Sequence, residues 1–169
     1  LTEVLFAQSL LASRRGDEKS ALALAERTAE LAARTGAVVE AAMAQAQLAW
    51  SRYTLGELDA AQQLAERAVA AARRGRAQVD NMSMRTLVVQ TLTVEVVVQR
   101  AQGARAAALA GITEALALAQ VDDLRIPQAN LLLTLGVLAS EVGEFETSIE
   151  HHRSGLAVFD SLGLRMGEA

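Results

Sequence analysis

Apolar and small residues recur along most of the chain every three or four positions, which is the period of a helix with one buried face. Eight stretches show this pattern, and each is predicted to be an α-helix. Their ranges are 5–15, 21–34, 38–55, 58–74, 82–102, 104–120, 128–142 and 145–162. Most are followed by glycine, which accepts the left-handed conformation that ends many helices. The pattern therefore predicts helix pairs joined by glycine turns.

Two predicted boundaries depend on particular residues. Gly75 lies between two arginines that interrupt the helical pattern, so it is expected to end the fourth helix. Asp122 and Asp123 are candidate N-caps for the seventh helix, because their side chains can accept hydrogen bonds from its first N–H groups. Pro127 would then lie in the first turn, where its missing N–H removes no hydrogen bond.

One segment has a composition that favours a different structure. Residues 78–100 contain no alanine and are rich in valine and threonine, which are common in β-strands. A strand here would have no partner strand elsewhere in the chain, and Leu92, Val96 and Gln99 keep helical spacing. A helix is therefore predicted, with a strand as the alternative.

The sequence contains an internal repeat of 40 residues. Leu-Ala-Glu-Arg at 24–27 recurs at 64–67, and Leu-Arg at 124–125 recurs at 164–165, with Ala129 and Ala169 in register. Gly56 and Gly103 are 47 positions apart, so about seven extra residues are expected near 73–81. The predicted units of this single repeat domain are 1–36, 37–75, 80–121 and 122–163, with 164–169 as the start of a further unit. The chain is accordingly expected to be a piece of a longer protein.

The composition supports an all-helical protein. Alanine supplies 35 of the 169 residues and leucine 25, whereas aromatic residues make up 3%. Alanine has the highest helix propensity, and small side chains let helices approach closely. One proline and no cysteine argue against a β-sandwich, a disulfide-stapled secreted domain and a disordered chain.

The repeat resembles the tetratricopeptide repeat, a helix–turn–helix unit with small residues at fixed places. The fourth unit carries the resemblance most fully, at Leu132, Leu135, Gly136, Ala139, Gly143, Phe145, Ser148 and Gly155. Units of about 40 residues are longer than the family's usual unit. Leu-Gly followed by Gly-Glu-Ala at 162–169 is similar to the repeat arrays of large bacterial transcriptional and signalling regulators.

The chain departs from the family pattern at several positions. Gln8 and Glu95 occupy the leucine position of units one and three. The aromatic residue of the second helix is replaced in all four units, and no proline ends a unit. The replacements are Ala25, Ala65, Ile112 and His152.

The resemblance implies an all-α, right-handed superhelical solenoid of antiparallel helix pairs, about eight helices in total. The first helix of each unit would line a concave face that binds a protein or a peptide. The candidate groove residues are Phe6, Arg14, Met43, Gln47, Trp50, Tyr53, Gln90, Val97, Arg100, Asn130, Thr134, Ser140 and Glu141.

Trp50 and Tyr53 are the centre of this candidate groove. They lie one helical turn apart, and aromatic residues and arginine dominate binding hot spots. Arg14 and Arg100 would flank them as polar anchors. The alternative is that Trp50 and Tyr53 pack between the repeat units and have no contact with a ligand.

The last predicted helix is expected to carry an unpaired apolar face. Val158, Phe159 and Leu162 lie on it, and solenoids normally cover such a face with a polar helix. Self-association through these residues is therefore an alternative function, in which the module assembles copies of its own chain without a separate ligand.

Catalysis has little support in the sequence. His151 and His152 are the two histidines, and adjacent helical residues point about 100° apart, so they cannot bind one metal together. No phosphate-binding glycine loop and no cysteine are present. The sequence therefore predicts a non-catalytic protein without metal or cofactor.

Net charge and hydropathy narrow the partners further. The net charge is −4, which disfavours contact with nucleic acid. The cluster Arg73-Arg74-Gly75-Arg76 is expected to be a solvated helix end, with an acidic partner or a nucleic acid as the alternative. No apolar run approaches the length of a membrane span. A cytoplasmic protein of bacterial type is expected.

Overall fold

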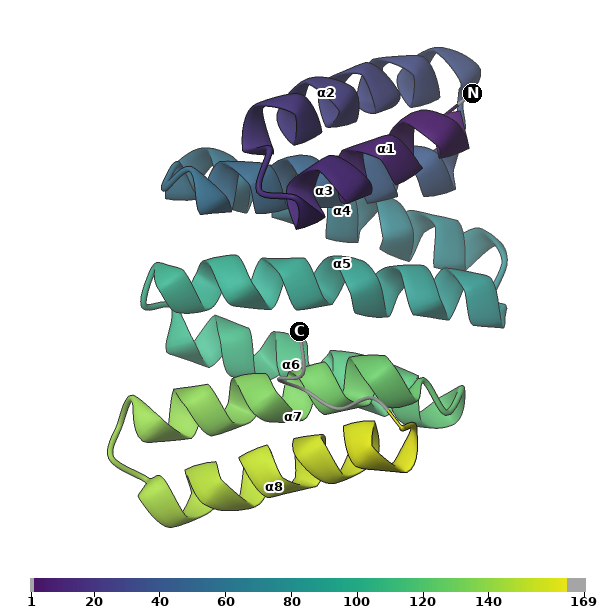
Figure 1. The fold of residues 1–169 in the computed structure, drawn as a ribbon. Coiled ribbons are helices and arrows are strands. Elements are labelled where there is room, and N and C mark those ends of the chain that lie inside the picture. The colour runs from purple at the N-terminus through teal and green to yellow at the C-terminus, as the bar shows by residue number, and fades with distance from the viewer. Residues whose placement is uncertain (1, 164–169) are drawn as a thin grey trace.

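The computed structural model describes residues 2–163 of the chain and shows eight α-helices there (Figure 1). They are α1 Thr2–Arg14, α2 Glu18–Thr35, α3 Val38–Thr54, α4 Leu58–Gln78, α5 Met82–Ala101, α6 Arg105–Val121, α7 Arg125–Ser140 and α8 Phe145–Ser161. The predicted all-α fold is confirmed, and the valine-rich segment is the helix α5. The expected start of a further unit at 164–169 lies outside the described residues.

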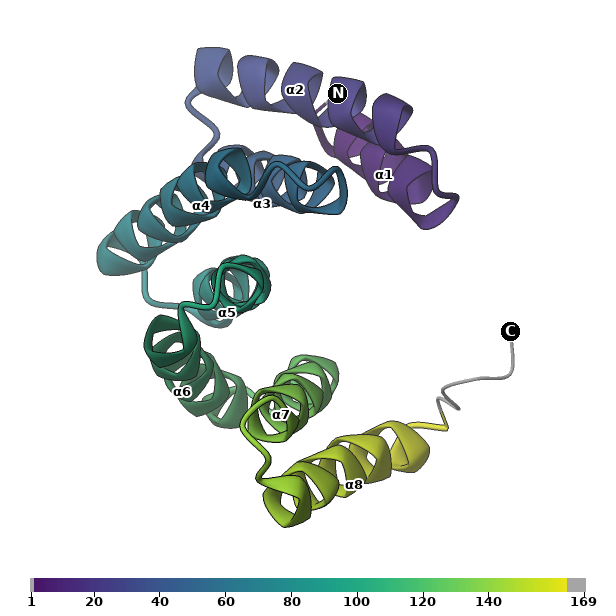
Figure 2. The same cartoon turned by 90° about the vertical axis from the view of Figure 1, so that its left-hand side faces the viewer.

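The helices form a curved stack of antiparallel pairs, which is an all-α solenoid. Figure 2 shows α1, α3, α5 and α7 on the inner side of the curve, with α2, α4 and α6 on the outer side. Each inner helix contacts the next inner helix, whereas none of these outer helices contacts another. The stack bends because its inner layer is continuous and its outer layer is splayed.

Alanine lines the interfaces of the outer helices. Ala21, Ala25 and Ala32 of α2 are fully buried, and α4 repeats the arrangement with alanine at its three equivalent positions, whereas α6 has Ile112 at the middle one. The distance between packed helices is set by the side chains at the contact, about 8–10 Å. Methyl groups at these positions keep each outer helix close to the two inner helices that it touches.

Glycine turns make the pairs antiparallel. Gly56 has φ +80°, which disfavours any residue with a Cβ, and α4 begins two residues later. The Glu57 N–H donates to the carbonyl of Arg52 at 2.9 Å and closes the end of α3. The chain therefore reverses within three residues.

The turn between α6 and α7 corrects the expected role of the two aspartates. Asp123 has φ +49° and takes the place that glycine has in the turns at Gly16, Gly36, Gly56, Gly103 and Gly143. Asp122 does not cap α7, whose N-cap is Leu124 with no side-chain hydrogen bond. The Asp122 carboxylate instead accepts hydrogen bonds from Arg85 Nε at 2.8 Å and Nη2 at 2.7 Å. The pKa of Asp122 is lowered by this pairing, which ties α5 to the next unit.

The expected helix end at Gly75 is also wrong. Helix α4 continues to Gln78, and Gly75 is buried inside it. A Cβ at Gly75 would lie 3.1 Å from Met84 Sδ and 3.5 Å from Val38 Cγ1. Gly75 is thus a place where α3 and α5 approach α4 closely. The extra residues of this unit lengthen α4 and the link to α5, where the Asn81 side chain accepts a hydrogen bond from the Met84 N–H at 2.9 Å.

The contact between Gly136 and His152 gives a test of the close packing. A Cβ at Gly136 would overlap the His152 imidazole, whose Nδ1 lies 2.8 Å from the Ser148 carbonyl oxygen. We expect Gly136→Ala to destabilise the protein by about 1–3 kcal/mol in urea unfolding, because the ring must leave this place. In a His152→Ala background, the same substitution should stabilise by about 0.5–1 kcal/mol through helix propensity. An equal cost in both backgrounds would contradict the assigned contact.

Candidate functional site

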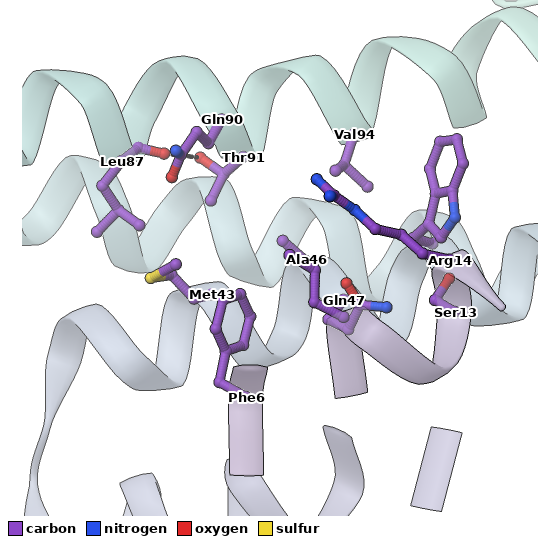
Figure 3. Close-up of a pocket in the computed structure, with 12 residues that line it drawn as sticks. Phe6, Ser13, Arg14, Met43, Ala46, Gln47, Leu87, Gln90, Thr91 and Val94 are labelled. Carbon is purple, nitrogen blue, oxygen red and sulfur yellow. Dashed lines mark hydrogen bonds between the residues drawn. The ribbon is translucent and has the colours of Figure 1, made fainter. Parts of the chain in front are cut away.

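Two pockets open on the concave side of the stack. The first pocket has a volume of about 440 Å³ and is formed by α1, α3 and α5 (Figure 3). It is lined by Phe6, Leu10, Ser13, Arg14, Met43, Ala46, Gln47, Trp50, Leu87, Gln90, Thr91 and Val94. The second pocket has a volume of about 380 Å³ and is formed by α5, α7 and α8. It is lined by Val97, Arg100, Leu133, Thr134, Val137, His152 and Leu156.

One strip of α5 forms a wall of both pockets. Leu87, Gln90 and Val94 line the first pocket, and Val97 lines the second. These residues are spaced by three, four and three positions, so they lie on one face of α5. The two pockets are therefore parts of one concave surface that the inner helices form together.

The first pocket has apolar walls that come from three helices. Figure 3 shows Phe6 of α1 close to Met43 of α3, with Leu87 of α5 on the far side. Thr91 adds little polarity, because its hydroxyl already donates to the Leu87 and Val88 carbonyl oxygens at 3.0 Å. Apolar side chains facing a concave surface are suited to hold an apolar group of a partner.

Arg14, Gln47 and Gln90 are the main polar side chains of this pocket. Arg14 is exposed, and it forms no ion pair with any acidic residue of the part that the structure describes. Figure 3 shows its guanidinium extending from α1 toward Val94 of α5. Gln47 is 8% exposed, and its buried Nε2 has no hydrogen-bond partner among the described residues. The pocket thus offers one cation and two amides, those of Gln47 and Gln90.

Trp50 lies on the concave surface and keeps 36% of its area exposed. Its ring packs against Tyr53, with the ring centroids 5.5 Å apart and the planes tilted by 47°. Tyr53 is half-buried and does not line the pocket. Trp50 is therefore placed to meet a ligand, while Tyr53 supports the indole from the next turn of α3.

The predicted groove residues fall into three groups. Six line the first pocket, and these are Phe6, Arg14, Met43, Gln47, Trp50 and Gln90. Three line the second pocket, and these are Val97, Arg100 and Thr134. Four line neither pocket, and these are Tyr53, Asn130, Ser140 and Glu141.

Two of the predicted polar positions are occupied by internal contacts. Arg100 Nη1 donates to Glu141 Oε1 at 2.9 Å, so this anchor is already paired with a carboxylate. The Ser140 hydroxyl donates to the Val137 carbonyl oxygen at 2.7 Å. The two pockets consequently differ in charge, because Arg14 forms no ion pair with any side chain that the structure describes and Arg100 is paired with Glu141.

Sequence reasoning missed His152 and Leu156, which line the second pocket from α8. The repeat rule assigns the groove to first helices, and α8 is a second helix. Among the described helices α8 contacts α7 alone, so its side facing the concave surface is left uncovered. These two residues could have been predicted from the sequence, because α8 is the second helix of the last predicted pair and no predicted helix follows it.

The structure corrects the expected exposed apolar face of α8 at Phe159, which is buried. Phe159 is 6% exposed, and it shares a buried side of α8 with Ser148 and Gly155, the side packed on α7. Val158 is partly buried and Leu162 is exposed. Side chains spaced by four and seven positions carry most of the exposed apolar area on α8, and these are Phe145, Ile149 and Leu156.

Glu95, the acidic residue of α5, lies away from both pockets. Glu95 is half-buried, and burial raises its pKa, with Arg73 opposing this effect and Glu66 and Glu114 adding to it. Arg73 itself pairs with Glu114 of α6. This cluster links the outer side of α4, α5 and α6, and its residues do not line the groove.

Neither a metal site nor a membrane span is found in the residues that the structure describes. No three His, Asp or Glu side chains that the structure describes come together as metal ligands. No described helix combines the length and the apolar character needed to cross a membrane.

No family model and no curated protein sequence matches the chain. Several solved structures are similar to it in fold, and two of them are RapI and BtubC. The apo form of RapI matches 94% of this chain and 43% of its own, at 14% identity and a TM-score of 0.69. BtubC (BKLC) from P. vanneervenii matches 100% of this chain and 67% of its own, at 16% identity and a TM-score of 0.72. This chain spans less than half of the RapI chain. At these identities the likeness shows a helical-repeat fold alone.

The exposure of Trp50 predicts a modest role in stability. We expect Trp50→Ala to cost about 1–2 kcal/mol in urea unfolding followed by circular dichroism, since part of the indole is already in water. Leu92→Ala is the matched control, because Leu92 is 1% exposed in the interior of α5 and should cost about 2–5 kcal/mol. If Trp50→Ala costs as much as Leu92→Ala, the indole belongs to the packing between units.

Proposed function

We propose that this chain is a non-catalytic scaffold that binds a protein or peptide segment through its concave side. The observation that carries the proposal is the first pocket. It has a volume of about 440 Å³ and mostly apolar walls, and the exposed side chains of Trp50 and Arg14 line it. Tryptophan and arginine in a hydrophobic surround are typical of binding hot spots. Because helices of three repeat units form this pocket, it favours a ligand that reaches across several units.

The wider setting is also a proposal. Four helix pairs with glycine turns and alanine interfaces support a tetratricopeptide-like array. The 40-residue unit and the sequence at 162–169 support a place within a cytoplasmic regulatory or signalling protein of bacterial type. In such an array the groove would recruit a partner for neighbouring domains.

A selection from random peptides tests the binding function. We expect a displayed library of 12-residue peptides to yield binders of this chain, whose affinities are then measured by fluorescence anisotropy. Val94→Glu places a charge in the first pocket and should weaken these peptides at least tenfold. Ala117→Glu adds the same charge at an exposed site on α6 and should leave the affinities unchanged.

Trp50→Ala gives a second pocket variant for this experiment, should Val94→Glu unfold. Failure to enrich any peptide would overturn the proposal. Peptides that lose affinity equally on Val94→Glu and Ala117→Glu would also count against it, because their site would then lie outside the groove.

Self-association is the second candidate function, and the uncovered side of α8 favours it. Leu156 is 42% exposed, whereas Val69, its equivalent 87 positions earlier in α4, is 2% exposed. In α4 this side is packed against the following helix α5. A second copy of the chain could cover the same side of α8.

Sedimentation equilibrium tests this second candidate. If α8 mediates assembly, the chain should dimerise at micromolar concentration, and Leu156→Glu should shift it to monomer. Ser154→Glu is the matched control on an exposed position of the same helix and should have no effect. A monomer at all concentrations up to about 0.5 mM would exclude an assembly function for this face, since that limit corresponds to a binding free energy weaker than about −4.5 kcal/mol.

A further inference from the structure

We infer that the partner segment binds in extended form, with an acidic residue next to an apolar anchor in the first pocket and a neutral apolar anchor in the second. The inference rests on the proposed binding function and adds the chemistry and spacing of the ligand. Its central observation is the difference in charge between two pockets of one surface.

Arg14 supplies the acidic preference. Its guanidinium is exposed at the first pocket and forms no ion pair with any described acidic residue, and Figure 3 shows it extending across the pocket toward α5. A guanidinium binds a carboxylate through two parallel hydrogen bonds. Phe6, Met43 and Leu87 provide the apolar wall beside it. An aspartate or glutamate next to an apolar side chain satisfies both features together.

The second pocket lacks this preference because its arginine is already paired. Arg100 donates to Glu141 at 2.9 Å, so an acidic ligand residue here would meet a carboxylate as well as a cation. Leu133, Val137 and Leu156 form the apolar part of the pocket. A neutral apolar side chain therefore fits this place better than an acidic one.

The amide of Gln47 favours an extended segment over a helical one. It lines the first pocket, it is 8% exposed, and its Nε2 has no acceptor among the groups that the structure describes. A helix uses its backbone carbonyl groups internally, whereas an extended segment leaves them free to accept hydrogen bonds. Rotation of the amide would present its N–H groups to such a carbonyl.

The register on α5 sets the spacing of the two anchors. The first pocket is centred near Gln90 and the second near Val97 and Arg100, which gives a separation of about 12 Å along the helix. On this face of α5 the first pocket lies toward α3 and the second toward α7, which adds about 9 Å, the distance between packed helices. The resulting distance of about 15 Å corresponds to four or five residues of an extended peptide.

A charge exchange tests the acidic preference on peptides selected against the wild-type chain. We expect most binders to carry Asp or Glu beside an apolar residue, and Arg14→Glu to weaken them at least tenfold. Replacing that acidic residue by arginine should restore binding to Arg14→Glu and weaken binding to wild type. Arg27→Glu is the matched control, because it makes the same charge reversal at an exposed site of α2 that lines neither pocket, and it should change affinity less than threefold.

Insertion of two or more glycines between the anchors tests the spacing, and it should weaken binding at least tenfold. Selected peptides that bind the groove without an acidic preference, or that are unaffected by Arg14→Glu, would overturn this inference while leaving the binding function in place. Peptides that tolerate the glycine insertions would overturn the two-anchor part. If no peptide is selected at all, the binding function and this inference fail together.

Discussion

The structure depends on the close approach of its helices, which fully buried alanines make possible. Ala25 of α2 and Ala65 of α4 occupy equivalent places, and Ala115 lies one turn from the equivalent place in α6. All three are fully buried. A larger side chain there would separate an outer helix from the inner helices that it joins. Because the inner helices contact one another and the outer helices do not, this spacing also produces the curvature. The concave surface is thus a consequence of small residues at the interfaces.

The same constraint determines where the large side chains can lie. The alanine-lined interfaces of α2 and α4 hold small side chains, and Trp50 and Phe6 are found on the concave surface, whereas Phe159 is buried where α8 packs on α7. The valine-rich helix α5 is the exception, since its β-branched residues are buried in the centre of the stack and contact helices on both sides. It joins the two halves of the solenoid and forms a wall of both pockets. Helix α5 therefore contributes both to the stability of the stack and to the proposed binding surface.

The fold could be predicted from the sequence because periodicity, glycine turns and the 40-residue repeat are local signals that agree with one another. Individual contacts could not, since they join residues far apart in the chain. Gly75 was expected to end a helix, but a buried glycine that permits close approach has the same sequence signature. Asp122 was expected to cap α7, but its partner Arg85 lies 37 positions away. Likewise, no local pattern indicates that Glu141 neutralises Arg100, which is the basis of the charge difference between the pockets.

Trp50 gives the most direct measurement of the central claim, because it is the one tryptophan of the sequence and lines the first pocket. The measurement is its fluorescence during titration with a selected peptide that contains no tryptophan. Burial of the indole by the ligand predicts a shift of the emission to shorter wavelength and weaker quenching by acrylamide, both saturating with the binding isotherm. A peptide that saturates the chain and leaves the emission and the quenching of Trp50 unchanged would contradict the assignment of the concave surface as the binding site.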